Sequence, residues 1–184
     1  MPTTINLTTG DDVLSQGDGD YVVNAYAGND SVSLGNATVG STVNGGGGAD
    51  TIVIGAGSHR VTGGAENDYV VVGDGNSTLI GGGGADGLHA LAGDHSITGG
   101  AGDDSISVGN GNSTINGNGG IDSISAGSGN HSIIGGSGTD SISVGHGNTT
   151  ISAGAGDDTI ALGFGGYNLN LGSGYNYVTY WTGS

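Results

Sequence analysis

Hydrophobic residues recur every nine positions along almost the whole chain. From Val43 to Val178, each step of nine meets Ile, Leu or Val. Upstream of Leu34 the same register continues after a shift of two residues, which predicts one two-residue insertion between Leu34 and Asn44. The series is Ile5, Leu14, Val23, Val32, Val43, Ile52, Val61, Val70, Leu79, Leu88, Ile97, Ile106, Ile115, Ile124, Ile133, Ile142, Ile151, Ile160, Leu169 and Val178.

Two kinds of nonapeptide alternate, so the true period is 18 residues. Residues 99–107 follow G-G-x-G-x-D-x-I-x, and residues 108–116 follow V-G-x-G-N-x-T-I-x. The glycines suit a turn, and the last residues alternate outward, inward and outward as in a short strand. A turn and a strand, twice over, make one coil. The pattern predicts an all-β, right-handed parallel β-roll (β-solenoid) of about ten coils with 18 residues per coil and a thin apolar core.

We expect a single roll over 1–184, with regular repeats at 45–179, less regular coils at 7–44 and an aromatic C-terminal tail at 180–184. Glycine supplies 45 residues and proline only one, while Val, Ile and Leu recur throughout. Disordered chains favour proline and lack β-branched residues, so the glycines are expected to serve turns.

The chain is strongly acidic, with 17 Asp and Glu, one Lys or Arg (Arg60), and a net charge of −16. Nucleic-acid binding needs a basic surface, and anionic membranes repel this charge, so neither partner is expected. With no cysteine there is no disulfide or thiolate site. The N-terminus does not resemble a Sec signal peptide, and no apolar run is long enough to insert in a membrane.

Aspartate occupies the sixth position of nearly every first-kind repeat, with Asn176 in the last. Neighbours one coil apart would lie ~4.8 Å from each other, where like charges repel by about a few kcal/mol at an effective dielectric of ~20. Counter-cations are therefore expected, and oxygen ligands in flexible loops favour Ca²⁺ over Zn²⁺ or Mg²⁺. The column comprises Asp12, Asp30, Asp50, Asp68, Asp86, Asp104, Asp122, Asp140 and Asp158.

The first-kind repeats resemble the RTX (hemolysin-type) calcium-binding nonapeptide G-G-x-G-x-D-x-U-x over about residues 7 to 179. The resemblance implies several Ca²⁺ ions between adjacent turns. Its ligands would be the nine aspartates and backbone carbonyls of turn residues such as Gly45, Gly63, Gly81, Gly99, Gly117 and Gly135. The second-kind repeats lack this aspartate, which indicates one ladder of calcium rather than two. Glu66 replaces a turn glycine, and Asn176 replaces the last aspartate.

The resemblance also implies secretion to the exterior or the cell surface by bacterial type I export, with a signal at the C-terminus. No Ser-His-Asp arrangement, carboxylate pair in a cleft or phosphate-binding loop is found, so we expect no enzyme activity. We expect a structural or adhesive building block of a surface layer, matrix or filament. The alternatives are an ice-binding β-solenoid and an accessory calcium-binding roll of a secreted enzyme.

His59, His95 and His131 share the sixth position of second-kind repeats. We expect them to be exposed turn residues, with a weak transition-metal or pH-sensing role as the alternative. Aspartates at other turn positions are expected to be solvated charges or outer-shell groups: Asp11, Asp18, Asp20, Asp74, Asp94, Asp103 and Asp157.

The outward faces are rows of hydroxyl side chains, which is also what an ice-binding solenoid presents. Bulky residues interrupt both rows, so ordinary solvent-facing strands are the favoured interpretation. One face carries Ser105, Ser107, Ser123, Ser125, Ser141 and Ser143, interrupted by Tyr69, Val71 and His89; the other carries Thr78, Ser96, Thr114, Ser132 and Thr150, interrupted by Arg60, Ile80 and Ile134.

Aromatic residues gather near the C-terminus, at Phe164, Tyr167, Tyr175, Tyr177, Tyr180 and Trp181. They predict either an aromatic plug over the last coil or a surface that meets another subunit. Because both terminal coils would expose strand edges, we expect a homo-oligomer or filament formed through the ends of the solenoid.

Overall fold

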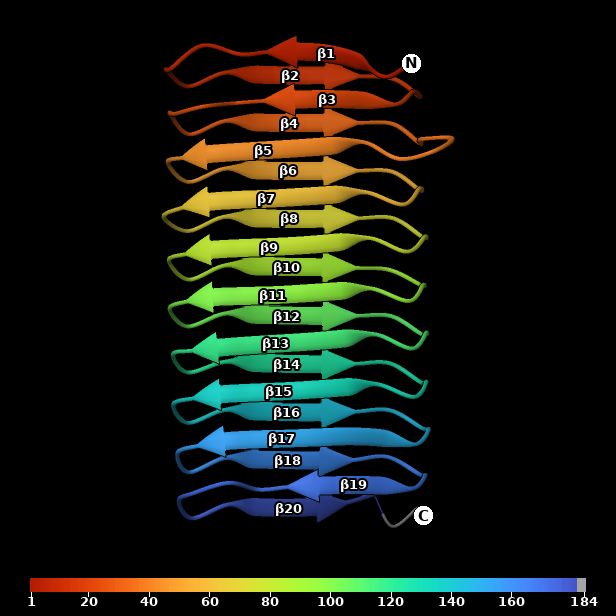
Figure 1. Ribbon diagram of the computed structural model, residues 1–184, viewed down its shortest axis with the longest axis vertical. Coiled ribbons are helices and arrows are strands. Elements are labelled where there is room, and N and C mark those ends of the chain that lie inside the picture. Colours follow the sequence, from red (N-terminus) through yellow and green to blue (C-terminus); the bar gives the residue numbers. More distant parts are fainter. Residues whose placement is uncertain (182–184) are drawn as a thin grey trace.

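The computed structural model describes residues 1–181, which form twenty short strands in two parallel ten-stranded sheets (Figure 1). Successive strands alternate between the sheets, so each pair makes one coil. The first sheet contains β1 (Thr3–Asn6), β3 (Tyr21–Asn24), β5 (Thr42–Gly47), β7 (Arg60–Ala65), β9 (Thr78–Gly83), β11 (Ser96–Ala101), β13 (Thr114–Gly119), β15 (Ser132–Ser137), β17 (Thr149–Ala155) and β19 (Tyr167–Asn170). The second contains β2 (Val13–Gln16), β4 (Ser31–Leu34), β6 (Thr51–Ile54), β8 (Tyr69–Val72), β10 (Gly87–Ala90), β12 (Ser105–Val108), β14 (Ser123–Ala126), β16 (Ser141–Val144), β18 (Thr159–Leu162) and β20 (Tyr177–Tyr180). The predicted parallel β-roll is confirmed.

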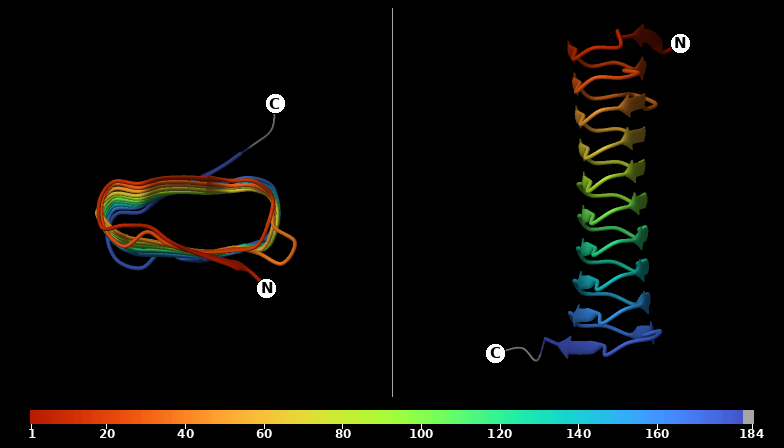
Figure 2. Two further views of the ribbon diagram at one scale, coloured as in Figure 1. Left: turned by 90° about the horizontal axis from the view of Figure 1, so that it is seen from above. Right: turned by 90° about the vertical axis from the view of Figure 1, so that its left-hand side faces the viewer.

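Strands of one sheet pair 18 residues apart, as the repeat predicts. Ile97 in β11 lies beside Ile115 in β13. Between β3 and β5 the offset is 20 residues, because Val22 pairs with Thr42. The predicted two-residue insertion is thus confirmed, and its loop projects from the roll after β4 (Figure 2).

The insertion loop is held by a single carboxylate of the preceding coil. Oδ1 of Asp20 accepts the backbone N–H groups of Thr38, Val39 and Gly40 at 3.0, 2.9 and 3.1 Å. Because this loop leaves the sheet, its backbone N–H groups would otherwise have no hydrogen-bond partner in the protein. Asp20 therefore lets the roll absorb two extra residues without losing its register.

The two sheets face each other across a thin apolar core, and the roll is flattened in cross-section (Figure 2). The nine-residue series supplies the inward side chains, which are fully buried from Val23 to Ile160. Each such burial contributes about 1.5–3 kcal/mol. A second inward row comprises Leu34, Ile54, Val72, Ala90, Val108, Ala126, Val144 and Leu162.

Glycine is required in the turns because successive coils touch there. Gly100 has a φ of 132°, and a Cβ on it would lie 2.0 Å from the carbonyl oxygen of Gly82. Any other residue would be strained by both its conformation and this contact. The repeating glycines therefore set the close stacking of the coils.

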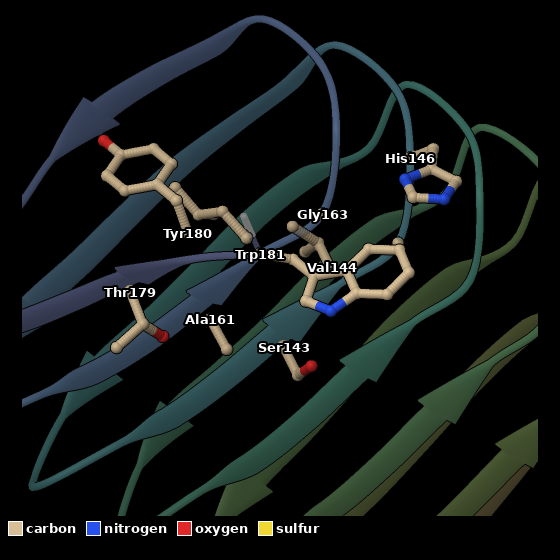
Figure 3. Close-up of a pocket in the computed structure, with 10 residues that line it drawn as sticks. Ser143, Val144, His146, Ala161, Gly163, Thr179, Tyr180 and Trp181 are labelled. Carbon is tan, nitrogen blue, oxygen red and sulfur yellow. The ribbon is translucent and has the colours of Figure 1, made fainter. Parts of the chain in front are cut away.

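Two of the C-terminal aromatic residues, Phe164 and Trp181, pack against each other on the flank of the roll rather than over its open end. The Trp181 ring lies 5.3 Å from that of Phe164 and 6.0 Å from that of His146. It lines a groove together with Ser143 and Ala161 (Figure 3). These rings therefore do not form the predicted aromatic plug, and the inward side chains of the last coil, Leu169, Leu171 and Val178, are only partly buried. Of the expected tail, residues 182–184 lie outside the described residues.

Residues 1–181 contain no helix that is long and apolar enough to cross a membrane.

Candidate metal centre

The aspartate ladder, comprising the nine aspartates of the first-kind repeats, runs along one edge of the roll. Each member ends a turn and directly precedes a strand of the second sheet, as Asp104 precedes β12. Eight members are only 1–3% exposed, so their side chains point inward: Asp30, Asp50, Asp68, Asp86, Asp104, Asp122, Asp140 and Asp158. The sequence places these residues on one edge, and the structure shows that the column is internal.

One oxygen of each buried carboxylate binds the neighbouring coil. The backbone N–H of Asp86 donates to Oδ1 of Asp104 at 2.8 Å, and the N–H of Asp104 donates to Oδ1 of Asp122 at 2.9 Å. The same bond recurs at 2.8–2.9 Å from the N–H of Asp12 through the N–H of Asp140. All the bonds point the same way, so the ladder has a polarity along the roll.

The second oxygen of each buried carboxylate has no hydrogen-bond partner within residues 1–181. An ionised carboxylate removed from water and left unpaired costs several kcal/mol. Burial, reinforced by neighbouring aspartates, accordingly raises the pKa of Asp68 to about 7 and that of Asp104 to about 6. Burial also raises the pKa of Asp50, Asp86, Asp122 and Asp140. The column therefore favours a bound proton or a bound cation.

Glycine faces the unpartnered oxygen in the six inner coils. A Cβ on Gly99 would lie 2.2 Å from Oδ2 of Asp104 and 2.9 Å from the carbonyl oxygen of Gly117. A carboxylate oxygen and a carbonyl oxygen thus converge on the space that the missing side chain leaves. Such hard oxygen donors suit Ca²⁺. The glycines that face the ladder are Gly45, Gly63, Gly81, Gly99, Gly117 and Gly135.

Carboxylates alone cannot complete a site here. Among the described residues, no three His, Cys, Asp or Glu side chains gather around one point. Flexible, high coordination numbers built from carboxylates and backbone carbonyls are typical of Ca²⁺. The residues present therefore fit calcium held between coils, with the aspartates supplying charge and the turns supplying carbonyl oxygens.

The ladder ends differently at its two termini. Asp12 is only half-buried, and its Oδ2 accepts both the backbone N–H and the hydroxyl of Thr8 at 2.7 Å. These bonds lower the pKa of Asp12. In the last coil Asn176 accepts the N–H of Asp158 through Oδ1, and its Nδ2 donates to the carbonyl of Leu171, both at 2.8 Å. Both end residues thus satisfy their own second polar atom.

The opposite edge carries a second internal ladder, which the sequence did not indicate. His59, His95 and His131 are 2–3% exposed, so the prediction of exposed turn residues is wrong. They alternate with Ser41, Ser77, Ser113 and Thr149, which are also buried. We call this set the His–Ser ladder. The alternation of His and Ser at the sixth position is the signal that could have revealed it.

Hydrogen bonds fix the protonation state of these histidines. The N–H of Ser77 donates to Nδ1 of His95 at 3.2 Å, and Nε2 of His95 lies 3.2 Å from the carbonyl oxygen of Leu91. One partner only donates and the other only accepts, so the ring is neutral with its proton on Nε2. Burial lowers the pKa of all three histidines, which favours the same neutral form.

The remaining turn aspartates are exposed charges as expected, apart from the half-buried Asp20, and each also accepts a backbone hydrogen bond. Asp94 accepts the N–H of Asn112 at 2.6 Å, and Asp103 accepts the N–H of Ile121 at 2.7 Å. Asp11, Asp18, Asp20, Asp74 and Asp157 do the same for later coils. Glu66, with a φ of 67°, reaches back to the N–H of Gly48 at 2.8 Å.

Comparison with known proteins agrees with this geometry. The family model for the RTX calcium-binding nonapeptide repeat (4 copies) matches overlapping segments at residues 41–58, 62–94, 88–115, 98–133, 107–142, 116–151, 134–169 and 143–177. No curated protein matches the chain. The matched segments cover well over half of the 184 residues, with glycines and aspartates in the positions that build the internal column. The chain belongs to the family of RTX calcium-binding nonapeptide-repeat proteins, in the form of a calcium-binding β-roll.

Proposed function

We propose that the chain is a non-catalytic structural rod that folds when it meets calcium outside the cell and then assembles end to end. The observation that carries the proposal is the row of eight buried Oδ2 atoms without partners. Folding brings these charges together in a chain that already has a net charge of −16. Bound Ca²⁺ compensates the charge, so the binding free energy of the metal is folding free energy.

Calcium-dependent folding is consistent with a protein that functions outside the cell. Extracellular calcium modules bind with dissociation constants of about 10⁻⁴–10⁻³ M, a range that cytosolic calcium does not reach. A chain that stays unfolded inside the cell suits one-step type I export, which the family resemblance suggests. Once outside, the same chain would fold into a rod.

The sheet edges at the two ends of the roll support assembly. Within residues 1–181, β1 and β2 at one end and β19 and β20 at the other have a neighbour on one side only. The aspartate ladder has a direction, with N–H donors facing the C-terminal end and Oδ1 acceptors facing the N-terminal end. Head-to-tail contact would therefore pair the Asn176 end of one copy with the Asp12 end of another. Contacts between unlike surfaces that do not close produce filaments.

Far-UV circular dichroism tests the folding half of the proposal. We expect a disordered spectrum with chelator and a β spectrum at millimolar Ca²⁺, with Mg²⁺ as the matched ionic control. An unchanged β spectrum in chelator would contradict calcium-dependent folding.

Electron microscopy and sedimentation at millimolar Ca²⁺ test the assembly half. Charges on edge strands block strand pairing. The double variant Asn168→Lys and Thr179→Lys, on the outward positions of β19 and β20, should therefore abolish filaments. Ser123→Lys, in the middle of the second sheet, should leave them intact. Monodisperse monomers of the unaltered chain at every concentration would refute assembly.

One observation favours a second function, ice binding. Ser105, Ser123 and Ser141 pair in register on three consecutive strands, beside a parallel row formed by Ser107, Ser125 and Ser143. This makes a small flat array of hydroxyl groups. Thermal hysteresis that disappears in a Ser125→Tyr variant, but not in a Thr114→Tyr variant on the opposite sheet, would support this function.

A further inference from the structure

The residue that faces the aspartate ladder changes between the inner and outer coils. In six inner coils this residue is glycine, five positions before its aspartate. In the outer coils it is Leu7, Ala25, Ala153 or Leu171. The outer coils therefore place a side chain where the inner coils leave space.

The backbone does not explain this difference. None of the six facing glycines has a positive φ, so each backbone conformation accepts a side chain. Ala25 and Ala153 occupy the same position with 0% exposure, in coils that keep a buried aspartate. The fold therefore tolerates a methyl group here. What a methyl group would remove is the space between the carboxylate oxygen and the carbonyl oxygen of the next coil, to which a Cβ on Gly81 would lie 2.2 and 2.6 Å away.

In the last coil the carbonyl oxygen that could bind an ion is also already occupied. The carbonyl oxygen that follows the series Gly117, Gly135 and Ala153 belongs to Leu171. That oxygen already accepts Nδ2 of Asn176 at 2.8 Å. At the other end, Oδ2 of Asp12 is occupied by Thr8. The groups that an ion needs are thus already bonded at both ends of the ladder.

We propose that the calcium ladder is confined to the six inner coils, from Asp50 to Asp140. Ala25 and Ala153 fill the space beside Asp30 and Asp158, so that six of the eight unpartnered Oδ2 atoms bind an ion and these two do not. The Asp12 and Asn176 coils are ion-free caps. This inference rests on the proposed calcium function and adds where the ladder starts and stops. Such caps give the terminal coils a stability that does not depend on filling an exposed site.

Loss of one ion is the first test. Gly99→Ala should bind one Ca²⁺ fewer than the unaltered chain in equilibrium dialysis with metal analysis at saturating Ca²⁺. Gly83→Ala is the matched control, since it adds the same methyl group at a position where a Cβ meets nothing within 4 Å. It should bind the same number of ions as the unaltered chain. Circular dichroism at the same Ca²⁺ concentration reports whether each variant folds.

Gain of one ion is the second test, and it decides the question if Gly99→Ala does not fold. The double variant Ala153→Gly and Asn176→Asp removes the methyl group and frees the Leu171 carbonyl, so it should bind one Ca²⁺ more. Ala155→Gly with Asn176→Asp is its control, because Ala155 is exposed and should add no site. Unchanged stoichiometry in both Gly99→Ala and the gain variant would overturn the confinement of the ladder. Absence of calcium binding by every protein, including the unaltered chain, would instead overturn the proposed function.

Discussion

Asp104→Asn separates the two roles of a ladder aspartate, because it removes a buried charge but keeps a hydrogen-bond acceptor. The new Oδ1 still accepts the N–H of Asp86, now 2.8 Å from the carboxylate. The last coil shows what the new amide can do, since Asn176 donates its Nδ2 to the carbonyl five residues earlier. We expect the variant to be more stable than the unaltered chain in chelator and less stable in calcium.

The pKa gives the size of the effect. Burial raises the pKa of Asp104 from 3.8 to about 6. A folded-state pKa above the unfolded one contributes stability below pH 3.8, and that stability is lost as the pH rises through about 6. At pH 8 the ionised side chain therefore costs about 3 kcal/mol, at about 1.4 kcal/mol per pKa unit. A neutral amide avoids this cost.

The assay is refolding in chelator at pH 8, followed by far-UV circular dichroism. Titration with trimethylamine N-oxide, which favours burial, brings the transition into range. Asp104→Asn should fold at a lower osmolyte concentration, with a gain of up to about 3 kcal/mol. In urea at saturating Ca²⁺ the sign should reverse, because one charged ligand is lost.

Asp103→Asn is the matched control. Asp103 is exposed and accepts the N–H of Ile121 at 2.7 Å, a bond that an amide oxygen also makes. Asp103→Asn also makes the net charge one unit less negative, but it changes no buried group. Equal shifts in the two variants would show that net charge, not burial, governs stability. Destabilisation of Asp104→Asn in chelator would refute the reasoning outright.

Three further predictions follow from the two ladders and the core. In chelator the β signal should rise as the pH falls from 8 to about 6.5, because protons replace calcium on carboxylates such as Asp68, whose pKa is about 7; a pH titration by circular dichroism that shows no rise would contradict this. In saturating Ca²⁺ the free energy of unfolding should decrease as the pH is lowered from 6.5. The buried histidines have a lowered pKa in the roll, so they protonate first in the unfolded chain, and the stability that they contribute above pH 6.5 is then lost. Urea titrations of the triple variant His59→Asn, His95→Asn and His131→Asn should show a smaller fall, and His146→Asn, an exposed residue, should behave as the unaltered chain does. Ile124→Ala should cost about 2–5 kcal/mol in urea at saturating Ca²⁺, against less than about 0.5 kcal/mol for the exposed Ser123→Ala.

The coil and its register could be predicted because a nine-residue period leaves few alternatives. Counting in steps of nine residues predicts every inward residue from Val23 to Ile160, and the one interruption of the count locates the insertion near Val39. The edge on which Asp104 and its equivalents lie follows from the period as well. These are properties of spacing, which the sequence states directly.

The direction in which a turn side chain points could not be predicted. A polar residue in a glycine-rich turn is usually exposed, and His95 follows Asp94, which is exposed as expected. His95 itself points inward because Ser77 and Leu91 offer a donor and an acceptor at 3.2 Å from its two ring nitrogens. Leu91 belongs to the same turn as His95, but Ser77 belongs to the preceding coil. The burial of His95 therefore follows only when the coils are stacked.

The two ladders make opposite demands on pH, and this limits what can replace calcium. Protons can neutralise Asp68 and Asp104 only near and below their pKa values of about 7 and 6. In that same range the unfolded chain begins to protonate its histidines, whose ordinary pKa is 6.5, while His95 in the roll must stay neutral to accept the N–H of Ser77. Lowering the pH therefore stabilises the roll through the aspartate ladder and destabilises it through the His–Ser ladder. A divalent cation neutralises the aspartate edge without touching the histidine edge, so the roll should reach its full stability only where calcium is abundant and the pH is neutral or above.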